Sequence, residues 1–502
     1  MHCRPVVLVP SALQAVQIAR ILRTGESIMA KERTDQNALD QERGDFAHGS
    51  VRRHIVRIAA PMALAQLVQI LYSVVDRIYI GHIPGASSTA LTGLGLSLPL
   101  VTIILACANL YGTGGVSLCS IARGKGDEER AERIMGNSFF MILVTSVLIM
   151  ALCYVVMEPL LRLFGASNES LPYARDYLMW YLVGTPFVMI STGMVGFINA
   201  QGFVKFGMAT ILLGAVTNIV LDPIFIFAMG WGIVGAAVAS VIAQLLSAAW
   251  AFRFLTGKRA LLRLTRASMR PSGSIVKSIM SLGLSGFVFQ ATNGIVQAVC
   301  TATLRTFGGD LFIGIMTVLT SVREVVILPM MSLANAAQPV IGFNYGAGLA
   351  PRIKSSIAFI TVTNVIYGIV AWGLLFVFPS QVMGLFNSDP ELLANGVPAL
   401  HLYFLGFFMM AFHSAGQSTF IGLGLARHAT FFSLLRKVIV VVPLTLILPH
   451  VGGLGATGVF LAEPISNFVS GISCFTVMLF ALRRVLATCG KPAEGEDQKQ
   501  VQ

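Results

Sequence analysis

The chain consists largely of long apolar stretches, and the short connections between them carry most of the charged residues. About 20 apolar residues are enough to cross the hydrocarbon core of a bilayer as an α-helix. Stretches of that length recur along the whole chain, which predicts membrane-spanning helices rather than barrel strands. The expected spans are roughly 54–80, 89–121, 134–157, 172–198, 204–229, 231–256, 275–306, 311–343, 353–378, 393–422, 428–450 and 454–484.

Composition also indicates an integral membrane protein of the all-α class. Of the 502 residues, 55% are hydrophobic and 12% are charged, whereas soluble domains carry about 25% charged residues. The 7 cysteines form no Cys-x-x-Cys pair, and most lie in apolar stretches. We therefore expect no disulfide, no metal site and no cofactor. The exception would be a small ion, H⁺ or Na⁺, whose movement across the membrane is coupled to the protein's activity.

The two ends of the chain differ from the rest. Residues 1–50 are too polar and too interrupted to cross a membrane, and Met29 is a possible alternative start. The segment 489–502 is also polar. We expect a cytoplasmic N-terminal extension and a polar cytoplasmic tail.

Basic residues collect in alternate connections. The net charge is +12, and the 258–272 connection is especially rich in Lys and Arg. Because positive residues stay on the cytoplasmic side, this pattern predicts that both termini and the 258–272 linker are cytoplasmic. The charge thus reports topology in the inner (plasma) membrane, not a nucleic-acid partner. The expected partners are the lipid bilayer and small molecules, and we expect a monomer.

The sequence repeats itself at a fixed spacing. Gly124 and Gly126 recur as Gly346 and Gly348, which are 222 residues further on. Other pairs are Phe164/Phe386, Tyr181/Tyr403, Gly184/Gly406, Gly202/Gly424 and, 220 residues apart, Gly232/Gly452 and Gly235/Gly455. The chain is expected to form two lobes of six helices, 51–257 and 273–488. An even number of helices gives both lobes the same orientation, which predicts two parallel repeats and alternating access to a cavity between them.

Four acidic residues lie well inside the expected spans: Asp76, Asp222, Glu324 and Glu463. A carboxylate at membrane depth costs about 3 kcal/mol on insertion scales, so each is a functional candidate. Asp222 immediately precedes Pro223, which has no N–H and frees the carbonyl oxygen four residues earlier. Alternatively, Asp222 has only a structural role: Pro223 kinks the helix, and a neighbouring group hydrogen-bonds the Asp222 carboxylate.

Polar residues share the helical faces of the first two acids. Asn218 lies four residues before Asp222, while Tyr72 and Gln69 lie four and seven residues before Asp76. At 1.5 Å per residue, both carboxyl groups are about 27–33 Å from the cytoplasmic face. Two hydrogen-bonded carboxyl groups at one depth predict a site that loads and releases protons. Interhelical hydrogen bonding is the alternative for Gln69 and Tyr72.

The segments around these residues resemble the MATE family of multidrug and toxin extrusion transporters. The likeness is carried by 73–81, 218–225 and 338–348, and it extends over about 51–484. It is greatest for the DinF/MepA-like branch. The NorM-like branch has acids on the seventh and tenth spans, whereas the seventh span here has Asn293.

This resemblance implies a MATE/MOP flippase-like fold and the export of cationic amphipathic compounds, with antibiotic resistance as a consequence. Entry of H⁺ or Na⁺ would drive export, and we favour H⁺. The implied ion-coupling residues are Tyr72, Asp76, Asn218 and Asp222, with a less specific match at Ser240. No Walker A motif is present, so ATP is not expected to drive transport directly.

The second half carries further charges inside its spans. Arg323 and Glu324 are adjacent in the eighth span, and adjacent residues do not face each other on a helix. Each needs another partner, and Glu463 is a candidate for Arg323. A coupling ion pair, a drug-cation site and a buried pair that sets helix register all remain open.

The sequence also allows two rival functions. A lipid-linked precursor flippase of the same superfamily would bring extra spans and cationic cavity residues. A rhomboid-like intramembrane serine protease could use Gly283-Leu-Ser-Gly286 with His401 or His413, but small residues at this spacing also let helices pack closely. Because His401, His413 and Gln417 line up near one face of the tenth span, we interpret them as a polar seam. We expect a transporter and not an enzyme.

Overall fold

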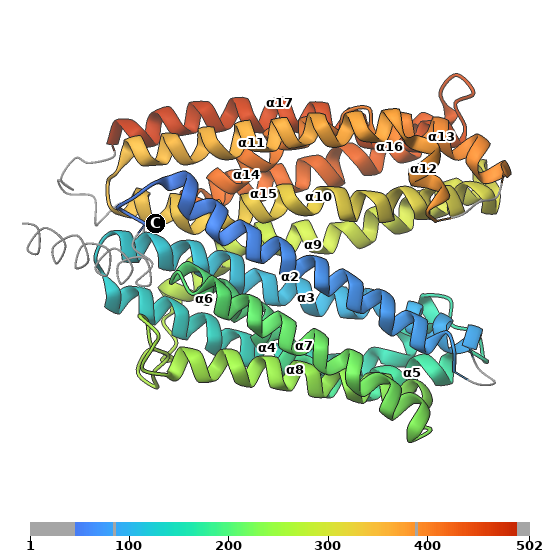
Figure 1. Ribbon diagram of the computed structural model, residues 1–502, viewed down its shortest axis with the longest axis horizontal. Helices are drawn as coiled ribbons and strands as arrows, with labels where there is room; N and C mark the ends of the chain where they lie inside the picture. Colours follow the sequence, from blue (N-terminus) through green and yellow to red (C-terminus); the bar gives the residue numbers. More distant parts are fainter. Residues whose placement is uncertain (1–45, 84–86, 387–389, 489–502) are drawn as a thin grey trace, which may run out of the picture. The chain divides into compact units, whose positions relative to one another are not determined.

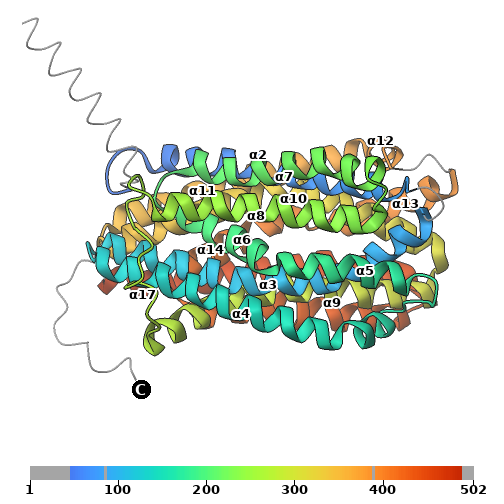
Figure 2. The same ribbon diagram turned by 90° about the horizontal axis from the view of Figure 1, so that it is seen from below.

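The computed structural model describes residues 46–83, 87–386 and 390–488, and all the regular secondary structure in these ranges is helical (Figures 1 and 2). The first half contains α2 (Val51–Ile80), α3 (Ser87–Gly124), α4 (Glu128–Leu163), α5 (Leu171–Tyr181), α6 (Thr185–Ala200), α7 (Val204–Pro223) and α8 (Gly232–Thr256). The second half contains α9 (Gly273–Phe307), α10 (Gly309–Gly346), α11 (Ala350–Val377), α12 (Pro379–Gly384), α13 (Pro390–Phe404), α14 (Met410–Gly422), α15 (Ala426–Leu434), α16 (Val442–Ile447) and α17 (Ala456–Thr488).

These helices make up the expected membrane spans. Within the described residues, 12 helical segments are long and apolar enough to cross a bilayer, as predicted. Their limits differ from the prediction mainly at polar ends. The third span begins at Glu128 and not at 134, because the Asp127 side chain accepts a hydrogen bond from the Arg130 amide (2.9 Å) and caps the helix. Hydropathy does not detect such a polar first turn.

Several spans are interrupted by short non-α turns. A 3₁₀ turn at Leu182–Gly184 joins α5 to α6, and another at Phe407–Met409 joins α13 to α14. Gly184 and Gly406, which the sequence repeat pairs, lie at these two breaks. A π-helical turn, Ile224–Ala228, follows Pro223, and a second one, Leu435–Val441, joins α15 to α16. Such turns often mark functional positions.

The repeat is visible in the way the two lobes meet. A Cβ at Gly124 would overlap the backbone of Phe343, and a Cβ at Gly346 would overlap the backbone of Ile121. The 222-residue spacing relates Gly124 to Gly346 and Ile121 to Phe343, so the two contacts are equivalent and the packing of α3 on α10 is reciprocal. This arrangement agrees with two parallel repeats around a common axis.

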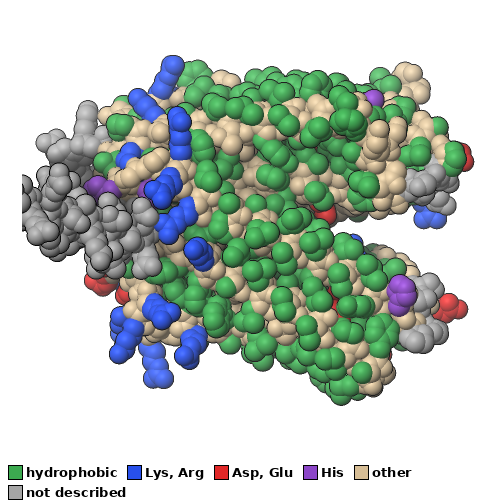
Figure 3. Space-filling model, viewed as in Figure 1, with side chains coloured by type: hydrophobic (Ala, Val, Ile, Leu, Met, Phe, Trp, Pro, Cys, Tyr) green, Lys and Arg blue, Asp and Glu red, His purple; other side chains and the backbone are tan. Residues whose placement is uncertain are grey.

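The two lobes touch at the end of the helices that contains Gly124 and Gly346, and they separate towards the other end. Helices α2–α8 form one lobe and α9–α17 the other (Figure 1). Lys and Arg side chains gather at one end of the molecule, and the surface between the lobes is hollowed at the other end (Figure 3). We call the first of these the basic end; it contains Gly124, Gly346 and Arg352.

Two connecting segments are held against the lobes at the basic end. In the 258–272 linker, the amide of Leu262 donates to Gln201 (3.0 Å) and that of Arg263 donates to Glu132 (2.8 Å), so the linker is fixed to the first lobe. Arg352 donates to the carbonyl oxygens of Phe46 (2.7 Å), His48 (3.2 Å) and Gly49 (2.9 Å), which fixes residues 46–50 to the second lobe. The remainder of the expected extension, 1–45, and the tail 489–502 lie outside the described residues.

Candidate functional site

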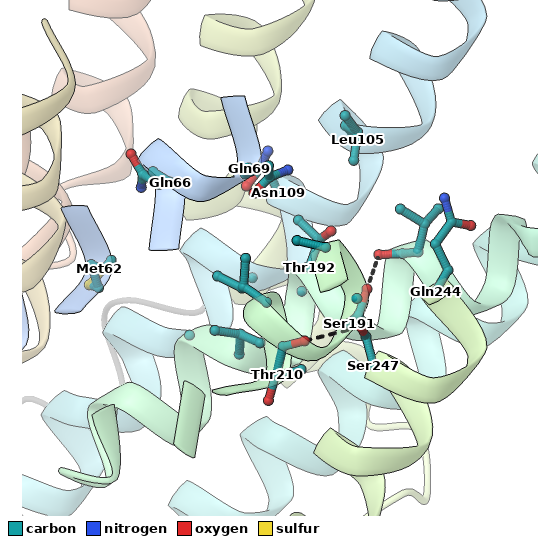
Figure 4. A pocket seen from close by; sticks show the side chains of 18 of the residues that line it. Met62, Gln66, Gln69, Leu105, Asn109, Ser191, Thr192, Thr210, Gln244 and Ser247 are labelled. Carbon is teal, nitrogen blue, oxygen red and sulfur yellow. Dashed lines mark hydrogen bonds between the residues drawn. The ribbon is translucent and has the colours of Figure 1, made fainter. Parts of the chain in front are cut away.

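A cavity of about 630 Å³ lies mainly in the first lobe and reaches α9 and α10 of the second. Its walls combine apolar side chains with amides and hydroxyls, and none of the residues that line it carries a charge. Figure 4 shows Gln66, Gln69 and Asn109 on one side of this cavity and Thr210 and Ser247 on another. Such a surface can hydrogen-bond and pack against varied ligands without requiring one particular charge pattern.

The two acids of the first lobe lie directly behind this wall. Asp222 is fully buried at the end of α7, and Asp76 is partly buried on α2. Their carboxyl groups lie within interaction distance of each other. Tyr72 and Asn218 line the cavity and also interact with this pair: Asn218 donates to Asp222, and Tyr72 interacts electrostatically with both acids. The expectation of two carboxyl groups at one depth therefore agrees with the structure.

Asn218 joins the acids to α8. Its side-chain N–H₂ donates to Asp222 Oδ1 (3.1 Å) and to Ser240 Oγ (3.3 Å). Three buried oxygens here have no hydrogen-bond partner among the described residues: Asp76 Oδ1, Asp222 Oδ2 and Asn218 Oδ1. Ser240 and Gln69 also line the cavity. The structure thus brings together all six first-lobe residues that the sequence singled out.

Sequence reasoning missed three neighbours of this pair. Tyr177 and Tyr181 of α5 stack on each other (5.5 Å between ring centroids) and face Asp76. Gln244 lies beside Tyr181 and lines the same cavity. Two signals were available: Tyr177 and Tyr181 are four residues apart, and Gln244 is four residues after Ser240.

The second lobe contains a separate charged cluster. Glu463 of α17 forms an ion pair with Arg323 (3.1 Å), as the sequence suggested, and also with Arg436 (2.7 Å) and Lys437 (3.7 Å). Arg436 and Lys437 lie on the π-helical turn of the eleventh span, and the sequence analysis did not identify them. Two adjacent basic residues inside an apolar stretch are nevertheless a signal of function. Glu324 is exposed, so it is not a member of a buried pair, because it points to a different side of α10.

The remaining polar candidates have mainly structural contacts. His401 contacts the Phe376 carbonyl oxygen (3.3 Å), and Gln417 donates to Ser433 (2.8 Å), as expected for a polar seam, although the 407–409 turn divides that seam. Ser285 donates to the Leu282 carbonyl oxygen (2.9 Å). Its neighbour Gly283 packs against the backbone of α3, which agrees with close helix packing.

Known proteins share this architecture. A multidrug export protein MepA from Staphylococcus saprophyticus is 22% identical over 458 residues, covering 91% of this chain and 100% of that protein. An FAD transporter from Shewanella oneidensis is 25% identical over 456 residues, covering 85% of this chain and 95% of that protein. A solved outward-facing multidrug resistance MATE family transporter of the MOP superfamily has a TM-score of 0.82 at 25% identity, with 89% of this chain and 98% of that one covered.

The family model for MatE matches this chain over residues 61–224 and 287–447. One matched segment lies in each lobe, which is what the internal repeat predicts. The matched segments account for more than half of the chain and contain Asp76, Asp222 and Arg436. The resemblance seen in the sequence is therefore confirmed, and the chain belongs to the MatE family.

Proposed function

We propose that the protein exports cationic amphipathic compounds in exchange for protons, by alternating access of the cavity to the two sides of the membrane. Family membership and the multidrug export relatives support export of varied small molecules. The cavity volume of about 630 Å³ falls within the roughly 300–1,000 Å³ of pockets for drug-sized ligands. Its neutral amides and hydroxyls beside apolar walls suit ligands of varied shape.

The observation that carries the proposal is the Asp76–Asp222 pair behind the cavity wall. Two carboxyl groups facing each other in a membrane interior repel when both are ionised, and a bound proton or other cation relieves that repulsion. Tyr72 and Asn218 line the cavity and also interact with this pair, Asn218 by a hydrogen bond and Tyr72 electrostatically. Ion binding and substrate binding can therefore influence each other through two shared side chains.

Sodium is the second candidate for the coupling ion. Three unpartnered oxygens from Asp76, Asp222 and Asn218 are of the hard ligand type that alkali cations bind. A proton requires only the carboxyl pair, and for this reason we favour H⁺.

The proposed orientation follows from the Lys and Arg residues. We propose that the basic end faces the cytoplasm of a cell whose plasma membrane holds the protein, so that the observed state is open to the outside. Because one chain supplies the whole cavity wall, we propose that the monomer is the working unit.

The test is dye efflux from proteoliposomes with pH and sodium gradients imposed separately. With a cationic dye such as ethidium, we expect the pH gradient alone to drive transport. Asp222→Asn keeps the size of the side chain but cannot exchange a proton, so transport should fall to the background rate. Glu169→Gln, at an exposed position, is the matched control and should behave as wild type. Transport that follows only sodium would refute the proton, and wild-type transport by Asp222→Asn would refute the site.

A further inference from the structure

The charged cluster of the second lobe does not balance its charges. Arg323, Arg436 and Lys437 surround a single carboxylate, Glu463. The side chains of Arg436, Lys437 and Glu463 are 1%, 2% and 6% exposed, and that of Arg323 is 19% exposed. With every group in its usual ionised form, the cluster carries two excess positive charges. Each buried charge is costly at membrane depth unless it is compensated.

The neighbours of Arg436 accept hydrogen bonds from only part of its guanidinium group. One guanidinium nitrogen of Arg436, Nη2, donates to Glu463 (2.7 Å) and to Asn467 (3.2 Å). Its Nε and Nη1 have no hydrogen-bond partner among the described residues. A guanidinium offers five N–H donors and cannot accept a hydrogen bond. The free donors therefore require an acceptor, and the charge sum requires a negative one.

A second cavity lies between the lobes beside His413, which interacts with this cluster; none of the four charged residues lines the cavity itself. It has a volume of about 290 Å³ and is lined by His413, Ser414 and Gln417 of α14. His413 is buried, and it interacts electrostatically with Arg436 and Lys437. Its Nδ1 also lacks a hydrogen-bond partner among the described residues. Several polar residues, Gln66, Asn109, Gln290, Asn335 and Gln338, line both cavities, so the two adjoin.

We propose that the second lobe binds an anionic group, a carboxylate or a phosphate of an amphipathic organic compound, at Arg436, Lys437 and Arg323 by way of the cavity beside His413. The two lobes then have opposite preferences: the first holds a cation at its acids, and the second holds an anion at its bases. Exported compounds consequently include amphipathic anions and zwitterions, and not only cations. This inference rests on the proposed export function only in treating the bound anion as cargo.

Binding to the purified detergent-solubilised protein tests the inference without any transport or coupling. Fluorescein and rhodamine 123 share a xanthene skeleton but carry opposite charge, so fluorescence anisotropy with the two dyes isolates the effect of charge. We expect saturable binding of fluorescein to wild type. Arg436→Gln should weaken it by at least about tenfold, while rhodamine 123 binding changes less than about twofold. Arg305→Gln, which removes an exposed charge from the same lobe, is the control and should leave both dyes unaffected.

A second variant separates an anion site from a structural ion pair. Glu463→Gln removes the only carboxylate among the described residues that pairs with the three bases, so fluorescein should bind a few-fold more tightly. A purely structural cluster predicts no such gain. Competition by inorganic phosphate would identify a free anion as the ligand, and competition by phosphatidylglycerol a lipid headgroup; either supports the anion site. The inference is overturned if wild type shows no saturable fluorescein binding, or if Arg436→Gln and Glu463→Gln both bind fluorescein as Arg305→Gln does.

Discussion

The reciprocal contact between α3 and α10 is so close that adding one methyl group, by a glycine-to-alanine substitution, is predicted to force the lobes apart at the basic end. Gly124 and Gly346 let the backbones of α3 and α10 touch, and this contact joins the two lobes at the basic end. If alternating access requires the lobes to separate there, Gly346→Ala should favour the state in which the basic end is open. Gly124→Ala should act in the same way, because the repeat makes the two positions equivalent.

The size of the effect follows from the distances. A Cβ at Gly346 would lie 3.0 Å from the carbonyl carbon of Ile121 and 3.0 Å from the amide nitrogen of Lys125, and it would overlap the Ile121 oxygen. Ordinary carbon contacts are about 3.5–4.0 Å, and a rigid backbone cannot yield as a side chain can. Overpacking of this kind costs about 1–3 kcal/mol. The equilibrium between closed and open states should therefore shift by roughly 5–150-fold.

Spin labels can measure the shift directly. In a cysteine-free background, labels at Lys125→Cys and Lys354→Cys lie on different lobes at the basic end, and pulsed electron resonance reports the distance between them. We expect a longer-distance population to appear in Gly346→Ala. The control is Gly373→Ala in α11, where a Cβ would meet nothing within 4 Å. If the distance distribution stays unchanged in both Gly346→Ala and Gly124→Ala, this contact does not act as a gate.

Three further outcomes can be tested more briefly. Asn218→Ala should slow dye export by a few-fold, less than Asp222→Asn, because it removes a hydrogen-bond donor and leaves the carboxyl pair; export per transporter in membranes measures this. Arg352→Ala should lower the free energy of unfolding by about 1–3 kcal/mol in thermal denaturation, because its guanidinium holds the carbonyl oxygens of residues 46–49. A reporter fused after Arg484 should read as cytoplasmic, and an external signal would contradict the proposed topology.

The spans and the repeat could be predicted from the sequence because both are local signals. A stretch of apolar residues is visible wherever it occurs, and glycines at a fixed spacing survive because turns such as those at Gly126 (φ +77°) and Gly348 (φ +71°) need a left-handed backbone. The grouping of Asp76 with Asp222 could also be inferred, since helix rise alone converts sequence position into depth.

The partners of the charged residues were harder to infer because sequence does not reveal which helices pack together. Arg436 and Lys437 lie in an apolar stretch where only the charges themselves stand out, and their convergence on Glu463 depends on the π-helical turn that carries them. Tyr177 is a similar case. Its ring could have faced lipid, and only the packing of α5 turns it towards Asp76.

The duplicated frame also explains why the two lobes can differ in chemistry. At the 222-residue spacing, Asp76 corresponds to Ala298 and Arg323 to Val101, so a charged position in one lobe is apolar in the other. The contact between the lobes constrains both copies alike, because each backbone must fit against the other, and glycines of α3 and α10 meet this requirement in both copies. A ligand requires only one copy of each binding group. One lobe can therefore carry acids and the other bases on the same repeated frame.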